Sequence, residues 1–324
     1  MKKEEIIRIL PLRIRQMVDT YMEDFEKLQE IRLRCNQPIF FQYDNQEYYI
    51  TEQSMAEERK LGNQIPVFCR EEDIRQTVDF ISKYSVYAFQ EQIKQGFLTI
   101  QGGHRVGLCG DVVMENGQVS TMRNISFLNI RIAHERKHCS DALTKYLYCG
   151  ENSIYNTLLI SPPMYGKTTL LRDLIRNFSN GYSDEHSSHR GLKVGVVDER
   201  SEIAASYFGI PQNEIGIRTD VIDHITKDCG IMMLIRTMSP QIIALDEIGG
   251  EHDISSIEYG MNCGCKFIAT IHGDSIPDLL HKKSLKNMIS EHLFQRFLII
   301  KKEGSDRKVQ IYDESLHELG LTSC

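Results

Sequence analysis

The chain has 324 residues, 41% hydrophobic and 26% charged, which is ordinary globular usage and enough for about two domains. Its formal net charge of -7 argues against a chromatin-type protein, and we expect no nucleic-acid partner. Its apolar runs fall far short of the ~20 residues of a membrane helix, and its first residues lack a signal-peptide core. We therefore expect a cytoplasmic protein that reaches a membrane only through partners.

The nine cysteines are scattered, and no two of them form a CxxC pair. Cys263 and Cys265 lie close together, but a zinc site needs two further ligands at short spacing, and only His272 is near. This pattern favours reduced thiols in a reducing compartment over a metal site.

The first part of the chain combines helical and strand signals. Apolar residues at helical spacing up to about residue 34 predict one or two amphipathic helices, interrupted at Pro11. Strands are predicted at 30–34, 39–42 and 48–51, a helix from Glu71, and tight hairpins around Gly102-Gly103 and Asn116-Gly117. We expect a smaller α+β domain with an antiparallel sheet over residues 1–140.

The pattern changes at about Ser140. Continuous apolar runs that alternate with helical segments predict a mostly parallel sheet covered on both faces, hence an α/β domain over residues 141–324. The predicted strands are 156–160, 193–197, 242–245 and 266–270, and the predicted helices are a stretch through Leu143 and Leu147, then 168–178, 228–238 and 254–262. The polar stretch 179–190 is expected to be a loop.

One segment of this domain matches the phosphate-loop pattern GxxxxGK[ST], with serine in place of the first glycine. It reads Ser161, Pro162, Pro163, Met164, Tyr165, Gly166, Lys167 and Thr168, and Thr169 follows at the start of the predicted helix. Its backbone N–H groups would hold the phosphates of ATP, Lys167 would reach the β- and γ-phosphates, and Thr168 would bind Mg²⁺. A chance turn before a helix is the alternative that this segment alone leaves open.

A second sequence motif makes it less plausible that the 161–168 segment is a chance turn before a helix. The apolar run 242–245 ends in Asp246 and Glu247, the Walker B pattern, in which the aspartate holds Mg²⁺ through water and the glutamate activates the attacking water. Alone, such a pair is usually a strand end that meets a loop. Together with the phosphate loop and the parallel-sheet pattern, it predicts an ATPase.

Two further residues end predicted strands, where a parallel sheet binds its ligands. Glu199 follows the run 193–197, and we favour a catalytic role over an exposed loop position. His272 follows the run 266–270, where a γ-phosphate sensor belongs, although a structural histidine is equally compatible with the pattern.

Long runs of the chain resemble the stage III sporulation protein AA family. They are 30–34, 102–107, 129–133, 191–204, 211–213, 216–221 and 232–240. That family is similar to RecA-like secretion and pilus ATPases, which form hexameric rings. The resemblance implies a homo-hexameric P-loop motor that hydrolyses ATP for a transport complex between mother cell and forespore, with membrane-embedded partners. The acidic box of those ATPases would fall on Asp198-Glu199 and their histidine box on residues 270–273.

The resemblance also implies a role for arginines, because in a ring ATPase an arginine of the neighbouring subunit can stabilise the charge that develops on the phosphates. We expect Arg131 and Arg218 to be such contacts, although each could be an ordinary surface residue. Ser161 and the Met164-Tyr165 pair depart from the family pattern. Two rival functions therefore remain: a non-hydrolysing nucleotide-binding switch with a degenerate loop, and a DNA-acting RecA-like motor, which the acidic charge balance disfavours.

Overall fold

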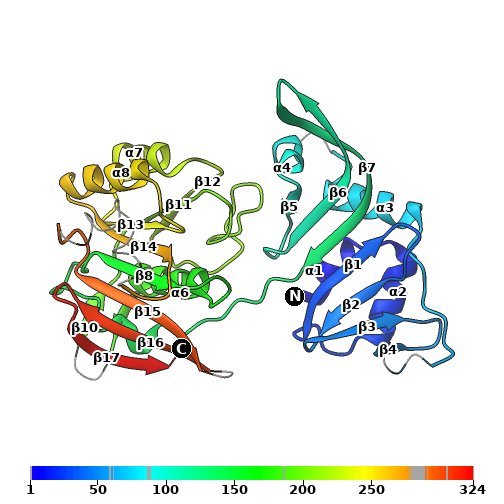
Figure 1. The fold of residues 1–324 in the computed structure, drawn as a ribbon, viewed down its shortest axis with the longest axis horizontal. Helices are drawn as coiled ribbons and strands as arrows, with labels where there is room; N and C mark the ends of the chain where they lie inside the picture. Colours follow the sequence, from blue (N-terminus) through cyan, green and yellow to red (C-terminus); the bar gives the residue numbers. More distant parts are fainter. Residues whose placement is uncertain are drawn as a thin grey trace. The chain divides into compact units, whose positions relative to one another are not determined.

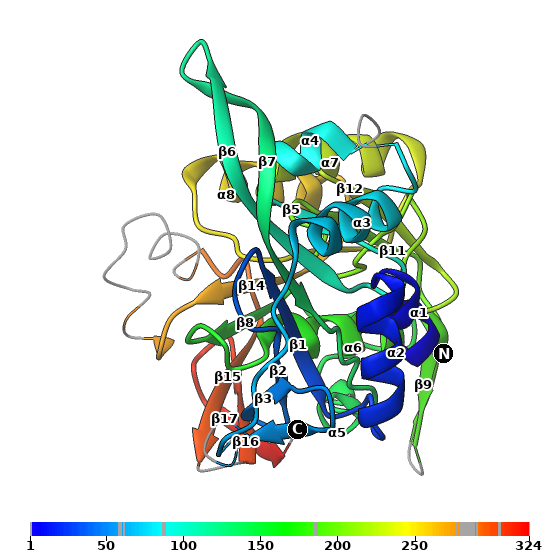
Figure 2. The same ribbon diagram turned by 90° about the vertical axis from the view of Figure 1, so that its right-hand side faces the viewer.

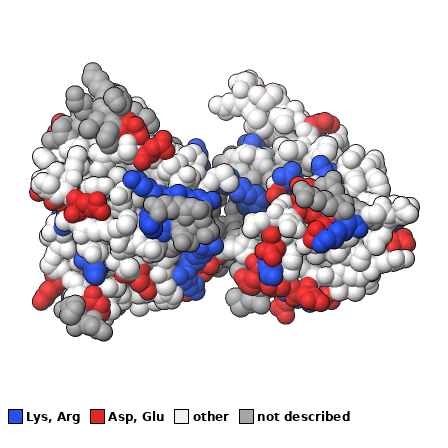
Figure 3. All heavy atoms as spheres, turned by 60° about the horizontal axis from the view of Figure 1, so that its bottom comes forward, with Lys and Arg blue, Asp and Glu red and all other residues white. Residues whose placement is uncertain are grey.

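The computed structural model describes residues 2–57, 60, 62–85, 89–184, 187–276, 278, 289, 291–303 and 306–323. The chain divides into two compact units, Met1–His134 and Glu135–Cys324 (Figure 1). No helix of the described residues is long and apolar enough to cross a bilayer. Charged side chains of both signs are spread over the drawn face of each unit (Figure 3).

The first unit is an antiparallel sheet with helices, as its sequence pattern predicts. The strands follow one another in the sheet as β4-β3-β2-β1-β7-β6-β5. Their bounds are Leu28–Arg34 (β1), Phe40–Tyr43 (β2), Gln46–Ile50 (β3), Met55–Glu57 (β4), Phe97–Thr99 (β5), Arg105–Glu115 (β6) and Gln118–Arg131 (β7). The helices are Lys2–Arg8 (α1), Leu12–Tyr21 (α2), Glu71–Ile81 (α3) and Gln90–Lys94 (α4). Pro11 separates the first two helices, as expected from its missing N–H.

The two predicted hairpins share one long strand. β6 pairs with β5 through residues 105–107 and with β7 along its whole length, with two irregularities of register (Figure 2). Asn116 and Gly117 both have positive φ, 52° and 76°, which suits the tight turn between β6 and β7. The two predicted hairpins therefore do not have separate strands, because both of them use β6.

The second unit contains a sheet of eight strands in the order β12-β11-β13-β14-β8-β15-β16-β17. Neighbours from β12 to β15 are parallel, and β16 and β17 are antiparallel, so the expected mostly parallel sheet is confirmed. The strands are Thr157–Ser161 (β8), Val194–Asp198 (β11), Thr219–Asp223 (β12), Ile242–Leu245 (β13), Lys266–His272 (β14), Arg296–Glu303 (β15), Asp306–Asp313 (β16) and Glu318–Ser323 (β17). The helices are Asp141–Thr144 (α5), Lys167–Asn180 (α6), Lys227–Thr237 (α7) and Glu251–Asn262 (α8).

The register of this sheet gathers polar residues at one edge. Val197 of β11 lies opposite Leu245 of β13, and His272 of β14 lies opposite Ser161 of β8. Because these strands are parallel, their carboxyl ends meet at the same edge. The polar residues that follow β8, β11 and β13 therefore collect there, which is where open α/β sheets bind ligands.

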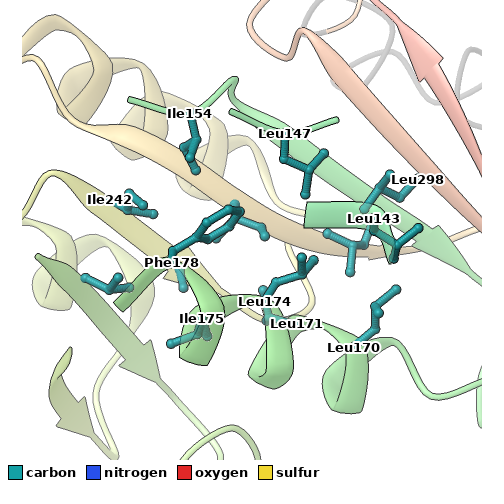
Figure 4. Packing of buried hydrophobic residues seen from close by; sticks show 14 of the residues in the cluster. Leu143, Leu147, Ile154, Leu170, Leu171, Leu174, Ile175, Phe178, Ile242 and Leu298 are labelled. Atoms are coloured by element: carbon teal, nitrogen blue, oxygen red, sulfur yellow. The ribbon is translucent and has the colours of Figure 1, made fainter. Parts of the chain in front are cut away.

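Helix α6 is anchored by a dense apolar face. Leu170, Leu171, Leu174, Ile175 and Phe178 are almost completely buried in one cluster, and Figure 4 shows them beside the residues contributed by other elements. Burying a side chain of this kind contributes about 1.5–3 kcal/mol. The packing holds the first turn of α6, and with it Lys167 and Thr168, in a fixed place at the sheet edge.

Two local expectations for this unit were wrong. The stretch 179–190 is not simply a loop, because α6 continues to Asn180 and two short strands, Gly181–Ser183 (β9) and Ser188–Arg190 (β10), pair with each other. The helix extends past the predicted end because Asn177, Phe178 and Ser179 are buried in the core. It ends at Gly181, whose φ of 96° does not fit a helix. The helix expected through Leu143 and Leu147 is the single turn α5.

Candidate functional site

The 161–168 loop connects β8 to α6 at the carboxyl edge of the sheet. Ser161 is fully buried, and its hydroxyl donates to the carbonyl of Pro162 at 2.8 Å. Met164 is 94% exposed with a φ of 65°, and Gly166 has a φ of 92°. A Cβ on Gly166 would lie 2.7 Å from Nη1 of Arg307. The left-handed conformation explains glycine at the last position before the helix, whereas the Arg307 contact involves the end of a flexible side chain that can move aside.

Lys167 lies in a triangle of charged and polar groups. Its Nζ donates to Oε1 of Glu247 at 2.8 Å and lies 3.1 Å from Nε2 of His272. His272 Nε2 is itself 2.9 Å from the same Glu247 oxygen. The Lys167 side chain is only 8% exposed, so its charge needs such partners. The three residues come from α6 and from the ends of β13 and β14, so the fold brings together residues that are far apart in sequence.

Thr168 and Asp246 also meet. The Thr168 hydroxyl donates to Oδ2 of Asp246 at 2.6 Å, and the Thr270 hydroxyl donates to the other carboxylate oxygen. Thr270 in turn accepts the backbone N–H of Glu247 at 2.9 Å. Hydroxyl and carboxylate oxygens side by side are ligands that Mg²⁺ prefers. Thr270, which lies in the segment 270–273 that resembles a histidine box, holds the carboxylate in this position.

Glu247 has an unusual backbone and a strongly cationic environment. Its φ is 53°, a left-handed value that costs free energy for a residue with a Cβ and is concentrated at functional sites. Burial raises its pKa, but hydrogen bonds and charge from Lys167 and His272 outweigh burial and lower the pKa below its ordinary value. Arg200 donates to its second oxygen at 3.1 Å. Glu247 is therefore an ionised carboxylate held from both sides.

Asp198 has a mainly structural environment. Its carboxylate accepts backbone N–H groups of Glu202, Ile203 and Ala204 at 2.8, 3.0 and 2.8 Å. Burial nevertheless raises its pKa to about 6. Arg172 of α6 donates to the carbonyls of Glu202 and Ile203 at 2.7 and 2.6 Å, which ties this turn to the helix that follows the 161–168 loop.

Glu199 lies beside the site and has a cationic partner. Lys227, at the start of α7, donates to it at 2.5 Å and is only 9% exposed. The two line one pocket, the acidic pocket, together with Asp198, Arg200, Glu202, Asp246 and Glu247. Neither Lys227 nor Arg200 is among the site residues predicted from the sequence. Their signal was weak, because a lysine at a helix start and an arginine in an acidic run are common on ordinary surfaces.

Of the two selected arginines, Arg218 lies in the same unit as the 161–168 loop but away from it, and Arg131 belongs to the other unit. Arg218 donates to the carbonyl of Ser179 at 2.9 Å and precedes β12, at the amino edge of the parallel sheet, opposite the edge that holds the loop. Arg131 is the last residue of β7 in the first unit and lies opposite Glu30 of β1. A phosphate contact from a neighbouring subunit stays a prediction for both.

Comparison with known proteins gives two kinds of match. A family model described as "Sporulation stage III, protein AA" matches residues 1–319. The chain is 38% identical over 321 residues to "Stage III sporulation protein AA" of Bacillus subtilis (strain 168), and the match covers 98% of each chain. The resemblance inferred from the sequence motifs is confirmed.

Solved structures show the same fold at low identity. The X-ray structure of the Legionella pneumophila ATPase DotB has a TM-score of 0.56 at 14% identity, over 94% of this chain and 81% of that chain. The crystal structure of the pilus retraction motor PilT with bound ADP has a TM-score of 0.58 at 13% identity, over 95% and 82%. Likeness at these identities shows the fold alone, and the expected RecA-like fold preceded by an α+β part is confirmed.

Proposed function

The chain belongs to the sporulation stage III protein AA family, and from that premise we propose that it is an ATPase that binds ATP with Mg²⁺ and hydrolyses it. We further propose that it works as a homo-hexameric ring that drives a sporulation-specific transport complex between mother cell and forespore. In this proposal it is cytoplasmic and contacts the membrane through membrane-embedded components of that complex. The likeness to secretion and pilus ATPases in fold supports these finer points.

The observation that carries the proposal is the meeting of four side chains at one sheet edge. Lys167 and Thr168 open α6, and Asp246 and Glu247 follow β13, yet the lysine contacts the glutamate and the threonine contacts the aspartate. A phosphate-binding helix start and a carboxylate pair are the two halves of a P-loop ATPase site. A structural role alone would not require all four types at these positions.

The residues present also fit a magnesium nucleotide. The oxygens of Thr168 and Asp246 lie together as a hard donor set, and the left-handed Gly166 lets the backbone approach the phosphates closely. Bound Mg²⁺ would neutralise charge on the phosphate oxygens. Lys167 would bind the β- and γ-phosphates, and Glu247 would orient the attacking water and accept its proton.

Glu247 is the residue whose role would separate an enzyme from a nucleotide-binding switch. A general base must be ionised before the reaction, as a glutamate is at neutral pH, and loss of the Lys167 contact would remove part of what lowers the pKa of Glu247. Its contact with Lys167 blocks the lysine in the arrangement seen here. Phosphates that bind Lys167 would take over that contact and leave the carboxylate available for water.

The test measures phosphate release by the purified full chain with Mg²⁺ and ATP, with and without DNA, together with its molecular mass with and without ATP. We expect steady release that does not depend on DNA, and a hexamer when ATP is present. Nucleotide binding without release would favour the switch. Release that requires DNA would favour a DNA motor.

A further inference from the structure

The two oxygens of the Glu247 carboxylate contact different side chains. Oε1 accepts a hydrogen bond from Nζ of Lys167 at 2.8 Å and lies 2.9 Å from Nε2 of His272. Oε2 accepts a hydrogen bond from Nη1 of Arg200 at 3.1 Å. Lys167 and Glu247 have roles in the proposed hydrolysis, whereas Arg200 has none, so its contact with the proposed base needs an explanation.

Phosphate binding would affect the two oxygens differently. Lys167 is expected to bind the β- and γ-phosphates, and His272 ends the strand where a γ-phosphate sensor is expected. Both side chains contact Oε1, so this oxygen faces the space beside Lys167 in which the terminal phosphate would lie. A phosphate that bound Lys167 would release Oε1. Oε2 would keep its contact with Arg200, because that contact does not involve the lysine.

Arg200 lies on a turn, residues 199–204, whose backbone is held in place. Ser201, the next residue, has a φ of 53°, a left-handed value that costs free energy for a residue with a Cβ. Three backbone N–H groups of the turn donate to the Asp198 carboxylate, and the Ser201 hydroxyl donates to Asp223 at 2.9 Å. Arg172 of α6 donates to two carbonyls of the same turn. These hydrogen bonds fix the backbone of Arg200 relative to the helix that follows the 161–168 loop.

The contact between Arg200 and Glu247 contributes little to the stability of the fold. The Arg200 side chain is 66% exposed, and an ion pair with an exposed partner adds little to the free energy of unfolding. Orientation of the carboxylate is a better explanation, because a planar guanidinium on a fixed turn restricts where the carboxylate can point. A catalytic group that is held in its productive orientation speeds the reaction without tighter substrate binding.

We propose that Arg200 is a positioning residue, which holds Oε2 of Glu247 while nucleotide is bound so that Oε1 points at the attacking water. In the reaction the water oxygen bonds to the γ-phosphorus, and a proton of the water passes to Oε1. The bond between that phosphorus and the oxygen that bridges to the β-phosphate breaks, and its electron pair stays on ADP. The inference rests on the proposed function, since it assumes that Lys167 binds phosphate and that Glu247 activates water.

The test measures phosphate release by the purified full chain at a series of Mg²⁺-ATP concentrations. Arg200→Ala is expected to lower kcat about tenfold and to leave KM within about twofold of wild type, because orientation affects the rate and not the binding of ATP. Arg200→Lys keeps a cation that can reach Oε2 and is expected to recover part of kcat. Arg190→Ala, which removes an exposed arginine of β10, is the matched control and should resemble wild type.

A double variant shows whether Arg200 acts through Glu247. In a Glu247→Gln background, Arg200→Ala is expected to leave the residual rate within about twofold, since no carboxylate remains to be oriented. Single-turnover cleavage of labelled ATP, with protein in excess, measures these low rates. A further loss of about tenfold in the double variant would mean that Arg200 acts independently of Glu247, which would overturn the inference.

An unchanged kcat in Arg200→Ala, or a raised KM with kcat unchanged, would also overturn the inference, because the arginine would then be dispensable or would bind nucleotide instead. If Arg200→Ala misfolds, Arg200→Gln, which keeps much of the side-chain length without the charge, gives the same readout. A wild-type chain that binds ATP and releases no phosphate would mean that the proposed function itself fails, and no Arg200 variant is needed to see that outcome.

Discussion

Nζ of Lys167 lies 2.8 Å from Oε1 of Glu247, so the cation expected to bind phosphate contacts the carboxylate expected to activate water. His272 closes the triangle through its Nε2. In this arrangement the lysine and the glutamate satisfy each other in a partly buried site. A phosphate that bound Lys167 would therefore exchange one anion for another at the same ammonium, and that exchange would free Glu247.

We expect Lys167→Ala to abolish tight ATP binding, because it removes the side-chain cation at the loop. Calorimetric titration with Mg²⁺-ATP checks this. Lys193→Ala, which removes an exposed lysine just before β11, is the control and should bind like wild type. Unchanged affinity in Lys167→Ala would refute the assignment of the 161–168 loop to phosphate.

Glu247→Gln should keep nucleotide binding and lose turnover. The amide preserves the shape of the side chain but cannot accept a proton, and a positioned base contributes roughly 10²–10⁴-fold to a rate. Binding could even tighten, because Lys167 loses its competing carboxylate. Phosphate release is the measurement, with the exposed Glu314→Gln as control. Turnover within a few-fold of wild type would show that another group activates the water.

Substitutions at Ser161 and at Gly166 should have very different effects on ATP affinity. Ser161→Gly removes one local hydrogen bond to Pro162 and should change ATP affinity by about 1 kcal/mol or less. Gly166→Ala should be far worse, because its φ of 92° disfavours a Cβ and because a Cβ would occupy space that the phosphates need. Binding of a labelled ATP analogue to both variants gives the comparison. A hundredfold gain of affinity in Ser161→Gly would mean that the natural loop is defective.

The buried carboxyl of Asp198 predicts a pH dependence of stability. Burial raises its pKa to about 6, above the ~3.9 of an unfolded chain, so the folded state binds more protons between these values. Stability from this group is therefore fully present below about pH 4 and falls as the pH rises to about 6, by roughly 3 kcal/mol at most. Urea midpoints of wild type and Asp198→Asn from pH 4 to 7 test this. Asparagine does not titrate, so the difference between the two curves should change across the window, and parallel curves would contradict the prediction.

The sequence predicted the central strands of the second unit well because their signal is local. β11, β13 and β14 are continuous apolar runs, and burial on both faces of the sheet leaves such runs without alternation. The phosphate loop and the carboxylate pair were found for the same reason, since each lies at the end of such a run. β12 and β17 had no prediction, because their polar and charged residues leave no continuous apolar run. β15 had none either, although Phe297 to Ile300 form a buried apolar run like that of β13, so this strand could have been predicted.

The contacts between site residues could not be predicted in the same way. The pairing of Thr168 with Asp246 follows from the motifs, but the contact of Lys227 with Glu199 depends on how α7 packs on β11. Gly230, three residues after Lys227, allows that close packing, since a Cβ there would lie 2.5 Å from the Val197 side chain. Arg307 is beyond the last predicted strand altogether. Spacing in sequence carries no information about either contact.

The position of β8 in the sheet has a consequence for biosynthesis. β8 pairs with β14 and β15, which begin at Lys266 and Arg296. At about 5–20 residues per second, a ribosome needs roughly 5–20 s to make the chain between β8 and β14. During that time β8, which is buried along its whole length in the folded unit, has neither neighbour, and its apolar centre, Leu158 to Ile160, favours aggregation. The sheet of the second unit therefore closes around β8 only after β14 and β15 have been translated, and we expect a chain truncated before β15 to leave one edge of β8 unpaired.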